Sequence, residues 1–253
     1  MEFFDCNASY GIYSVPPYKR ADSVDVLIEE MEWCGIHRAM VRHAAMIDES
    51  PIVGNPLLLE QMKPYPNLEP SWGILPPQTK ELGTVQELMS SMKENNVKAL
   101  WAYPAKHRYL LNSTTFGELL EEMTYRNIPL FLERNESCGG NEWAVTADFV
   151  LKDFPKLTLI VVGHGSWGED RFFRPLIERY EGFYIDTSRY ELDGGIADFC
   201  KTYGPYRLLF GTNFPRTPMG GAMLTLMHAD IKEDEKAAIA GGNLERILSE
   251  VKL

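Results

Sequence analysis

The chain has 253 residues, of which 45% are hydrophobic, 24% charged and 11% aromatic, and its formal net charge is −11 at pH 7. This composition is that of an ordinary globular protein and excludes disordered, collagen-like and coiled-coil chains. The acidic excess argues against nucleic acid as a partner, because phosphates would meet a repulsive surface. No apolar run approaches the ~18 residues of a membrane span, so no membrane partner is expected.

The start of the chain and its cysteines predict a cytoplasmic location. Met1 and Glu2 lead straight into an apolar run with no basic segment of the kind that precedes a secretory signal. The four cysteines have no C-x-x-C spacing and are expected to be free thiols in a reducing compartment; they are Cys6, Cys34, Cys138 and Cys200.

Short β-rich runs alternate with amphipathic stretches along the whole sequence. The runs predicted as strands are residues 2–6, 39–43, 68–74, 98–102, 129–133, 157–162, 183–187 and 207–211. Between them, apolar residues at i, i+3 and i+4 predict helices over residues 23–34, 84–94, 115–125, 141–153, 170–179, 195–202 and 219–227. Two further helices are predicted at the C-terminus, over residues 233–240 and 243–252.

This alternation predicts an α/β fold with a parallel sheet. Eight strand–helix units in about 250 residues favour a single (β/α)8 TIM barrel over residues 1–253, sealed by the C-terminal helix pair. The alternative is a doubly wound open sheet. That fold usually has a glycine-rich turn after its first strand, whereas the segment 7–11 reads Asn-Ala-Ser-Tyr-Gly and is no phosphate-binding loop.

Polar side chains collect where the predicted strands end. In a TIM barrel these ends share one face, on which the chemistry takes place. The candidates are Asn7, Ser9, Arg42, Trp101, Glu133, Arg134, His164, Arg189, Asn213 and Arg216.

Five segments resemble the amidohydrolase-related family of the amidohydrolase 2 type. Residues 3–11 resemble its first strand, 162–165 its strand-6 histidine segment, 184–188 its strand-7 segment and 209–215 its Gly-Ser-Asp-Phe-Pro segment. Residues 241–248 resemble its closing helix, and the matches follow the order of the family. The resemblance implies a TIM barrel and usually one divalent metal that activates water for hydrolysis or assists decarboxylation.

The departures from the family pattern concern its metal ligands. The family opens with Asp-x-His-x-His, but this chain has Asn7 and Ser9 at the two histidine positions. It has Glu133 or Arg134 where a histidine usually ends strand 5, and Asn213 where strand 8 supplies an aspartate. A transition metal needs three or four good ligands, so the degenerate motif predicts no tightly bound metal cofactor.

Four arginines end strands in a chain that is acidic overall: Arg42, Arg134, Arg189 and Arg216. Arginine binds carboxylates and phosphates through two parallel hydrogen bonds, so these residues predict an anion-binding cavity. The alternative is that they pair with neighbouring carboxylates in an electrically neutral rim.

The sequence therefore predicts a hydrolase, or a decarboxylase, that acts on a small carboxylated molecule such as a lactone, ester or amide. His164, Glu133 and Asn213 are the expected catalytic residues. Burial would raise the pKa of Glu133 toward that of a general base, whereas a salt bridge to Arg42, Arg134 or Arg189 would lower it. Asn7, Ser9, Trp101 and the four arginines are the expected substrate-binding residues. The alternative is a non-catalytic barrel that binds an anionic metabolite or a partner subunit, and a homo-oligomer is the default assembly.

Overall fold

The computed structural model describes residues 1–134, 143–164 and 169–253. Its parallel strands are β1 (Phe4–Tyr10), β2 (Arg38–His43), β3 (Leu68–Pro70), β4 (Trp72–Gly73), β5 (Leu100–Ala102), β6 (Leu130–Glu133), β7 (Leu159–Val162), β8 (Phe183–Asp186) and β9 (Leu208–Leu209). They form two sheets in chain order, β1 to β3 and β4 to β9. The single run predicted over residues 68–74 contains both β3 and β4.

Backbone hydrogen bonds join the two sheets into a closed barrel. At one junction the amide of Ser71 donates to the Val41 carbonyl, while the next amide, of Trp72, donates to Ala99 on the other side, both over 3.1 Å. At the other junction the amide of Cys6 donates over 2.9 Å to the carbonyl of Phe210. The TIM barrel expected from the alternation of strands and helices is therefore confirmed.

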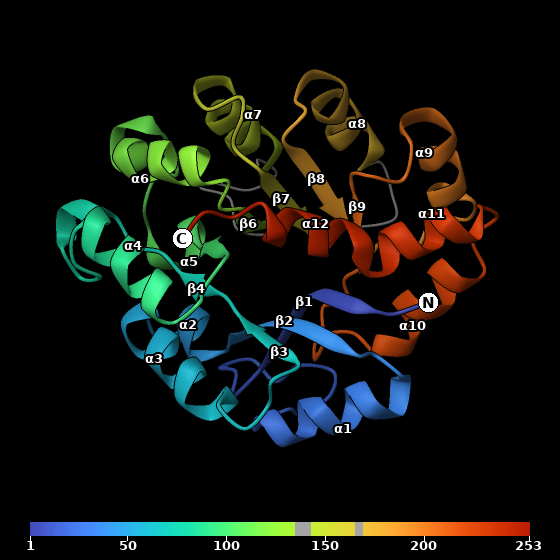
Figure 1. Cartoon of the computed structure of the whole chain (residues 1–253), viewed down its shortest axis with the longest axis horizontal. Helices are drawn as coiled ribbons and strands as arrows, with labels where there is room; N and C mark the ends of the chain where they lie inside the picture. The colour runs from blue at the N-terminus through green and yellow to red at the C-terminus, as the bar shows by residue number, and fades with distance from the viewer. Residues whose placement is uncertain (135–142, 165–168) are drawn as a thin grey trace.

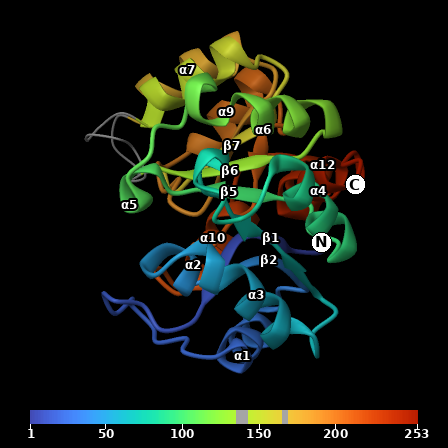
Figure 2. The same cartoon turned by 90° about the vertical axis from the view of Figure 1, so that its left-hand side faces the viewer.

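Helices surround the barrel (Figures 1 and 2). They are α1 (Val24–Cys34), α2 (Ala45–Asp48), α3 (Pro51–Met62), α4 (Val85–Glu94), α5 (Pro104–His107), α6 (Ser113–Arg126), α7 (Trp143–Asp153), α8 (Asp170–Arg179), α9 (Gly195–Tyr203), α10 (Met219–Met227), α11 (Glu233–Ala237) and α12 (Asn243–Ser249). Their ends follow local chemistry. Thr84 and Glu87 form a capping box at the start of α4, and Gly35 takes the left-handed conformation that ends α1.

The prediction missed the helices α2, α3 and α5 and ended β1 too early. Helix α3 has a proline inside it and little amphipathic character, so its periodicity is weak. A Cβ at Gly54 would lie 2.3 Å from the Met46 backbone nitrogen, which shows how closely α3 packs on α2. Strand β1 continues to Tyr10 with all seven residues buried, so Asn7 and Ser9 lie within the strand and not in a turn after it.

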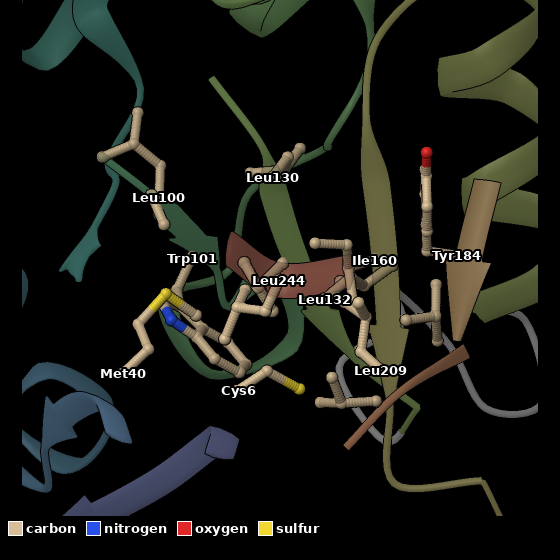
Figure 3. Close-up of a cluster of buried hydrophobic side chains, with 14 of the residues drawn as sticks. Cys6, Met40, Leu100, Trp101, Leu130, Leu132, Ile160, Tyr184, Leu209 and Leu244 are labelled. Atoms are coloured by element: carbon tan, nitrogen blue, oxygen red, sulfur yellow. The ribbon is translucent and has the colours of Figure 1, made fainter. Parts of the chain in front are cut away.

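The C-terminal helices seal the barrel at the end where the strands begin. Helices α11 and α12 are joined by a π-helical turn, η2 (Ala238–Gly242). Within this turn the carbonyl of Ile239 accepts a hydrogen bond of 3.0 Å from the amide of Phe210. Asn243 donates to the carbonyls of Pro205 and Leu208, at the start of β9. Leu244 of α12 is buried in the same core as the apolar strand residues drawn in Figure 3.

The cysteines agree with the expected free thiols as far as they are described. Cys6, Cys34 and Cys200 form no disulfide, and Cys138 lies outside the described residues. Within the described parts of the chain, none of the helices combines the length and the apolar character that crossing a membrane requires.

Replacing Leu244 with alanine is expected to lower the free energy of unfolding by about 2–5 kcal/mol, because a cavity is left at the base of the barrel. Leu224→Ala is the matched control, since Leu224 also lies on a helix but is 58% exposed. Urea unfolding measures both. Equal losses in the two variants would show that α12 does not seal the barrel core.

Candidate functional site

A cavity of about 130 Å³ opens at the carboxyl ends of the strands. It is lined by Asn7, Glu133, Arg134, Val162, Gly163, Arg189, Asn213, Arg216 and Thr217. This is the face on which TIM barrels carry their active sites. The cavity thus brings together, from five separate parts of the chain, most of the polar residues that the strand ends predicted.

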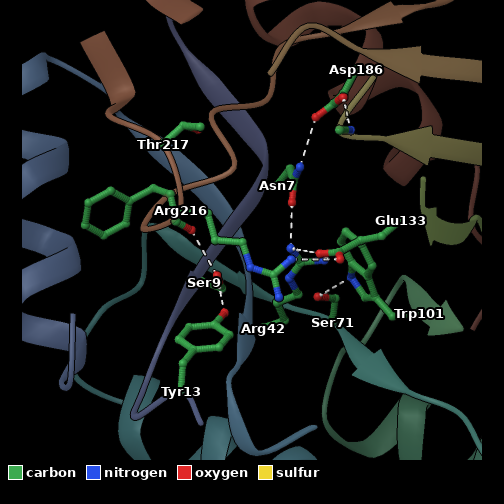
Figure 4. Close-up of polar contacts among 12 residues, drawn as sticks. Asn7, Ser9, Tyr13, Arg42, Ser71, Trp101, Glu133, Asp186, Arg216 and Thr217 are labelled. Carbon is green, nitrogen blue, oxygen red and sulfur yellow. Dashed lines mark hydrogen bonds and ion pairs between the residues drawn. The ribbon is translucent and has the colours of Figure 1, made fainter. Parts of the chain in front are cut away.

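Glu133, the last residue of β6, lies between two arginines (Figure 4). Its Oε1 is 2.5 Å from Nη2 of Arg42, and its Oε2 accepts a hydrogen bond of 3.0 Å from Nη1 of Arg216. Burial raises the pKa of Glu133, but the two guanidinium charges outweigh burial and hold it below the ordinary value. Of the two expectations, the salt bridge that lowers this pKa is therefore the one found, the rise through burial is wrong, and Glu133 is a carboxylate at neutral pH.

Arg42 lies behind the lining of the cavity and contacts two of the lining residues, Glu133 and Asn7. Its side chain is 1% exposed, and its guanidinium stacks on the ring of Trp101 with Cζ 4.0 Å from the ring centroid. Trp101 is itself buried and donates from Nε1 to the hydroxyl of Ser71 over 3.0 Å. Neither Arg42 nor Trp101 lines the cavity, so the expectation that they contact substrate is corrected to a supporting role.

Asn7 connects Arg42 to a second carboxylate, that of Asp186 (Figure 4). Its Oδ1 accepts from Nη2 of Arg42 over 2.9 Å, and its Nδ2 donates to Oδ2 of Asp186 over 3.0 Å. The other oxygen of Asp186 accepts from the backbone amide of Gly163 over 2.8 Å. A cation on one side and an anion on the other fix which way the Asn7 amide points.

Asp5 lies beneath Asn7 and is fully buried. It accepts hydrogen bonds from the backbone amides of Asn7 and Thr212 and from the hydroxyl of Thr212. Burial nevertheless raises the pKa of Asp5 to about 6, with a smaller contribution from the charge of Asp186. Asp5 therefore takes up a proton as the pH falls through about 6.

Ser9 is buried and does not line the cavity, so its expected contact with substrate is also corrected. Its hydroxyl donates to the Phe214 carbonyl over 2.9 Å and accepts from the Tyr13 hydroxyl over 2.6 Å. Tyr13, which the sequence did not single out, has the guanidinium of Arg216 5.5 Å from its ring centroid. Ser9 and Tyr13 thus help to hold the segment that carries Arg216.

His164 does not reach the cavity either. It is fully buried, its Nε2 donates to the Val161 carbonyl over 3.0 Å, and the rings of Trp143 and Phe173 pack on it at centroid distances of 5.0 and 5.3 Å. Its side chain therefore lies in the layer between strand and helices. The expected direct acid–base role of His164 is not compatible with this position.

The remaining candidates do line the cavity. Arg134, Arg189 and Arg216 share it with Glu133 and Asn213. Arg134 also pairs through Nε with Glu169 over 2.8 Å, and Arg216 pairs with Glu133. Pairing with neighbouring carboxylates, the alternative for these arginines, is found for Arg42, Arg134 and Arg216. The binding of an anion in the cavity stays a prediction.

Removing the charge of Glu133 is expected to destabilise the fold. Glu133→Gln leaves Arg42 as an unpaired buried charge, which should lower the free energy of unfolding by about 3–5 kcal/mol. Glu245→Gln is the matched control, since Glu245 pairs with Arg38 at the surface and its loss should cost about 1 kcal/mol or less. Chemical denaturation of both variants tests this, and equal losses would contradict it.

Asp5 is expected to make stability fall as the pH rises. The folded chain keeps a proton on Asp5 up to about pH 6, whereas the unfolded chain releases it near pH 4. This contribution is present below about pH 4 and lost as the pH rises through 6, a change of roughly 3 kcal/mol. Asp5→Asn mimics the protonated form. The free energy of unfolding of the variant, relative to that of the wild type, should therefore rise between pH 4 and 7. A difference that does not vary with pH would contradict the expectation.

Solved structures with the same architecture cover nearly the whole chain. An uncharacterised TIM-barrel protein of Bordetella bronchiseptica has a TM-score of 0.76 at 20% identity, over 99% of both chains. A dihydroxybenzoic acid decarboxylase of Polaromonas sp., with bound manganese and the inhibitor 2-nitroresorcinol, has 0.76 at 16%, over 98% of this chain and 97% of that one. A 5-carboxyvanillate decarboxylase of Novosphingobium aromaticivorans, also with manganese, has 0.74 at 13% over the same shares.

The expectation of no metal cofactor is corrected by these structures, because two proteins of this fold hold manganese. Among residues 1–134, 143–164 and 169–253, no group of three or more His, Cys, Asp or Glu side chains could hold a metal ion. Glu133 is paired with two arginines, Arg42 and Arg216. The guanidinium of Arg42 also donates to the side-chain oxygen of Asn7, so both possible oxygen ligands already face a positive charge. The described residues alone therefore do not fit a manganese centre.

The sequence itself identifies the family of the chain. No curated protein matches the chain. The model of the amidohydrolase family (Amidohydro_2) matches residues 11–249, which is almost the entire barrel. The chain belongs to the amidohydrolase family.

Proposed function

We propose that this protein is an enzyme that acts on a small carboxylated molecule in the cavity at the carboxyl ends of the strands. The observation that carries the proposal is the presence of Arg134, Arg189 and Arg216 around one cavity of about 130 Å³, in a chain with a net charge of −11. A guanidinium in a partly desolvated site binds a carboxylate through two hydrogen bonds. The cavity volume limits the substrate to a small molecule.

The other residues of the cavity are suited to orienting such a substrate. Asn7 and Asn213 offer neutral amide groups next to the arginines. Asn7 is held by Arg42 and Asp186, so its amide is already fixed when a substrate enters. A fixed polar group loses little conformational freedom on binding, which favours both affinity and correct placement.

Hydrolysis of a lactone or ester is the reaction that these groups support best. Water would add to the carbonyl carbon, the bond from that carbon to the leaving oxygen would break, and the leaving oxygen would take the proton. Glu133 faces the cavity as a carboxylate and would accept the proton of the attacking water. Since its low pKa makes it a weak base, an activated lactone suits this site better than an amide.

Decarboxylation of a small aromatic acid is the second candidate, because similar structures are those of dihydroxybenzoate and carboxyvanillate decarboxylases. The bond from the ring to the carboxyl carbon would break, carbon dioxide would leave, and the ring carbon would take a proton from water. The same arginines would bind the carboxylate before it leaves. Release of carbon dioxide distinguishes this reaction from hydrolysis.

Activity is tested with the purified chain against lactones, esters and hydroxybenzoates, with and without added Mn²⁺ because related structures contain it. Turnover of a carboxylated compound that is lost in Glu133→Asp supports the proposal. Binding of carboxylates with no turnover of any class would instead identify a non-catalytic barrel that binds an anion.

Arg216→Ala is expected to weaken the binding of benzoate about tenfold or more, since a charge-assisted hydrogen bond is worth about 1.5–3 kcal/mol. Arg216→Lys should restore only part of the affinity, because the two-pronged geometry is lost. Arg20→Ala is the control, as Arg20 is exposed and pairs with Asp22 away from the cavity. Calorimetry measures the affinities, and unchanged affinity in Arg216→Ala would contradict the anion site.

A further inference from the structure

Arg189 differs from the other arginines of the cavity lining in its partners. Arg134 pairs with Glu169, and Arg216 pairs with Glu133. Arg189 is exposed, and among the residues that the structure describes its side chain forms no ion pair and no hydrogen bond. The positive charge of Arg189 is therefore available to a ligand in the cavity.

The acidic residues nearest to Arg189 in the sequence do not neutralise it. Glu191 and Asp193 belong to the same loop, but they line a separate hollow beside α9 and α10. Neither pairs with Arg189 in the part of the chain that the structure describes. The chain has 36 acidic and 25 basic residues. A guanidinium that stays unpaired in such a chain, at the wall of a cavity, is suited to bind an anion from solution.

The backbone on both sides of Arg189 is held in place. The amide of Thr187 donates to the Leu209 carbonyl over 2.9 Å, and the amide of Tyr190 donates to the Thr187 carbonyl over 3.1 Å. Tyr190 is 1% exposed, and its ring packs edge-on against Phe173 at a centroid distance of 5.7 Å. Only the side chain of Arg189 then has to become ordered when an anion binds, which lowers the entropic cost of binding.

Arg189 and Glu133 belong to different parts of the cavity wall. Glu133 ends β6 and Arg189 follows β8, and these two strands lie on either side of β7. Two strand spacings put β6 and β8 about 10 Å apart. Gly163, which follows β7, lines the cavity between them, and a Cβ placed there would meet no heavy atom of the described residues within 4 Å. The wall between the two charged groups therefore leaves room for a ligand.

We propose that Arg189 determines the selectivity of the cavity for carboxylated substrates and orients them. Its guanidinium holds the carboxylate on the β8 side, so that the bond to be hydrolysed lies across Gly163 and next to Glu133. The substrate is then a small acid whose carboxylate and scissile ester or lactone bond are separate groups. The orientation rests on the hydrolysis proposed above, whereas the binding of a carboxylate by Arg189 does not.

Calorimetry with benzoate tests the binding of a carboxylate without any turnover. Arg189→Ala should bind benzoate about tenfold more weakly or worse, and Arg189→Lys should restore only part of the affinity. The melting temperature of Arg189→Ala should change by about 2 °C at most, since no carboxylate of the described residues loses a partner. Arg20→Ala, at an exposed ion pair away from the cavity, is the control. Unchanged affinity in Arg189→Ala would overturn the role of Arg189.

Steady-state kinetics with two lactones tests the orientation. γ-Butyrolactone and the same ring with a carboxyl group differ only in the group that Arg189 would hold. The ratio of kcat/KM for the carboxylated lactone to that for the plain lactone should fall about tenfold or more in Arg189→Ala, through a higher KM and not a lower kcat. A lower kcat for both lactones would place Arg189 at the reacting bond and overturn the orientation.

The two tests fail in different ways. If the wild type hydrolyses neither lactone, with or without added Mn²⁺, the proposed hydrolysis and the orientation are both refuted, while calorimetry still decides whether Arg189 binds a carboxylate. If the wild type hydrolyses them and Arg189→Ala keeps the same selectivity ratio, the proposed function stands and the role of Arg189 is overturned. No binding of benzoate by the wild type would refute the anion site as a whole.

Discussion

The site depends on one buried ion pair, between Arg42 of β2 and Glu133 of β6. Taking both charges out of water is costly, and each charge is tolerated only because the other is present. The pair is stabilised further by the ring of Trp101 beneath the guanidinium and by the amide of Asn7 beside it. Strands from distant parts of the barrel are thereby fixed relative to each other at the end where the cavity opens.

The same pair determines the charge that the cavity presents. Arg42 and Arg216 share the single carboxylate of Glu133, so this cluster of three side chains keeps a net positive charge next to the cavity. Arg216 extends the network to the segment after β9, and Asn7 extends it to Asp186. The chain is acidic overall, yet among the described residues its cavity is lined by three arginines and one glutamate, Glu133. An excess of positive charge around a cavity favours the binding of a small anion.

The fold could be predicted from the sequence because the alternation of strands and helices is regular and the family segments occur in order. The location of the candidate site could be predicted from the fold, because the carboxyl ends of all strands in a barrel share one face. Side-chain direction could not be predicted. Strand β1 has a register irregularity between Asp5 and Ala8, and His164 follows the end of β7, so periodicity did not reveal that Ser9 and His164 point away from the cavity. Tyr13 gave no signal because it lies beyond β1 and reaches the site through its contacts with Ser9 and Arg216.

A crystal structure with bound benzoate tests the central claim most directly. We expect the carboxylate to lie in the cavity and to accept hydrogen bonds from at least two of Arg134, Arg189 and Arg216, while Arg42 remains paired with Glu133. A carboxylate bound elsewhere, with these three arginines contacting only protein or solvent, would contradict it.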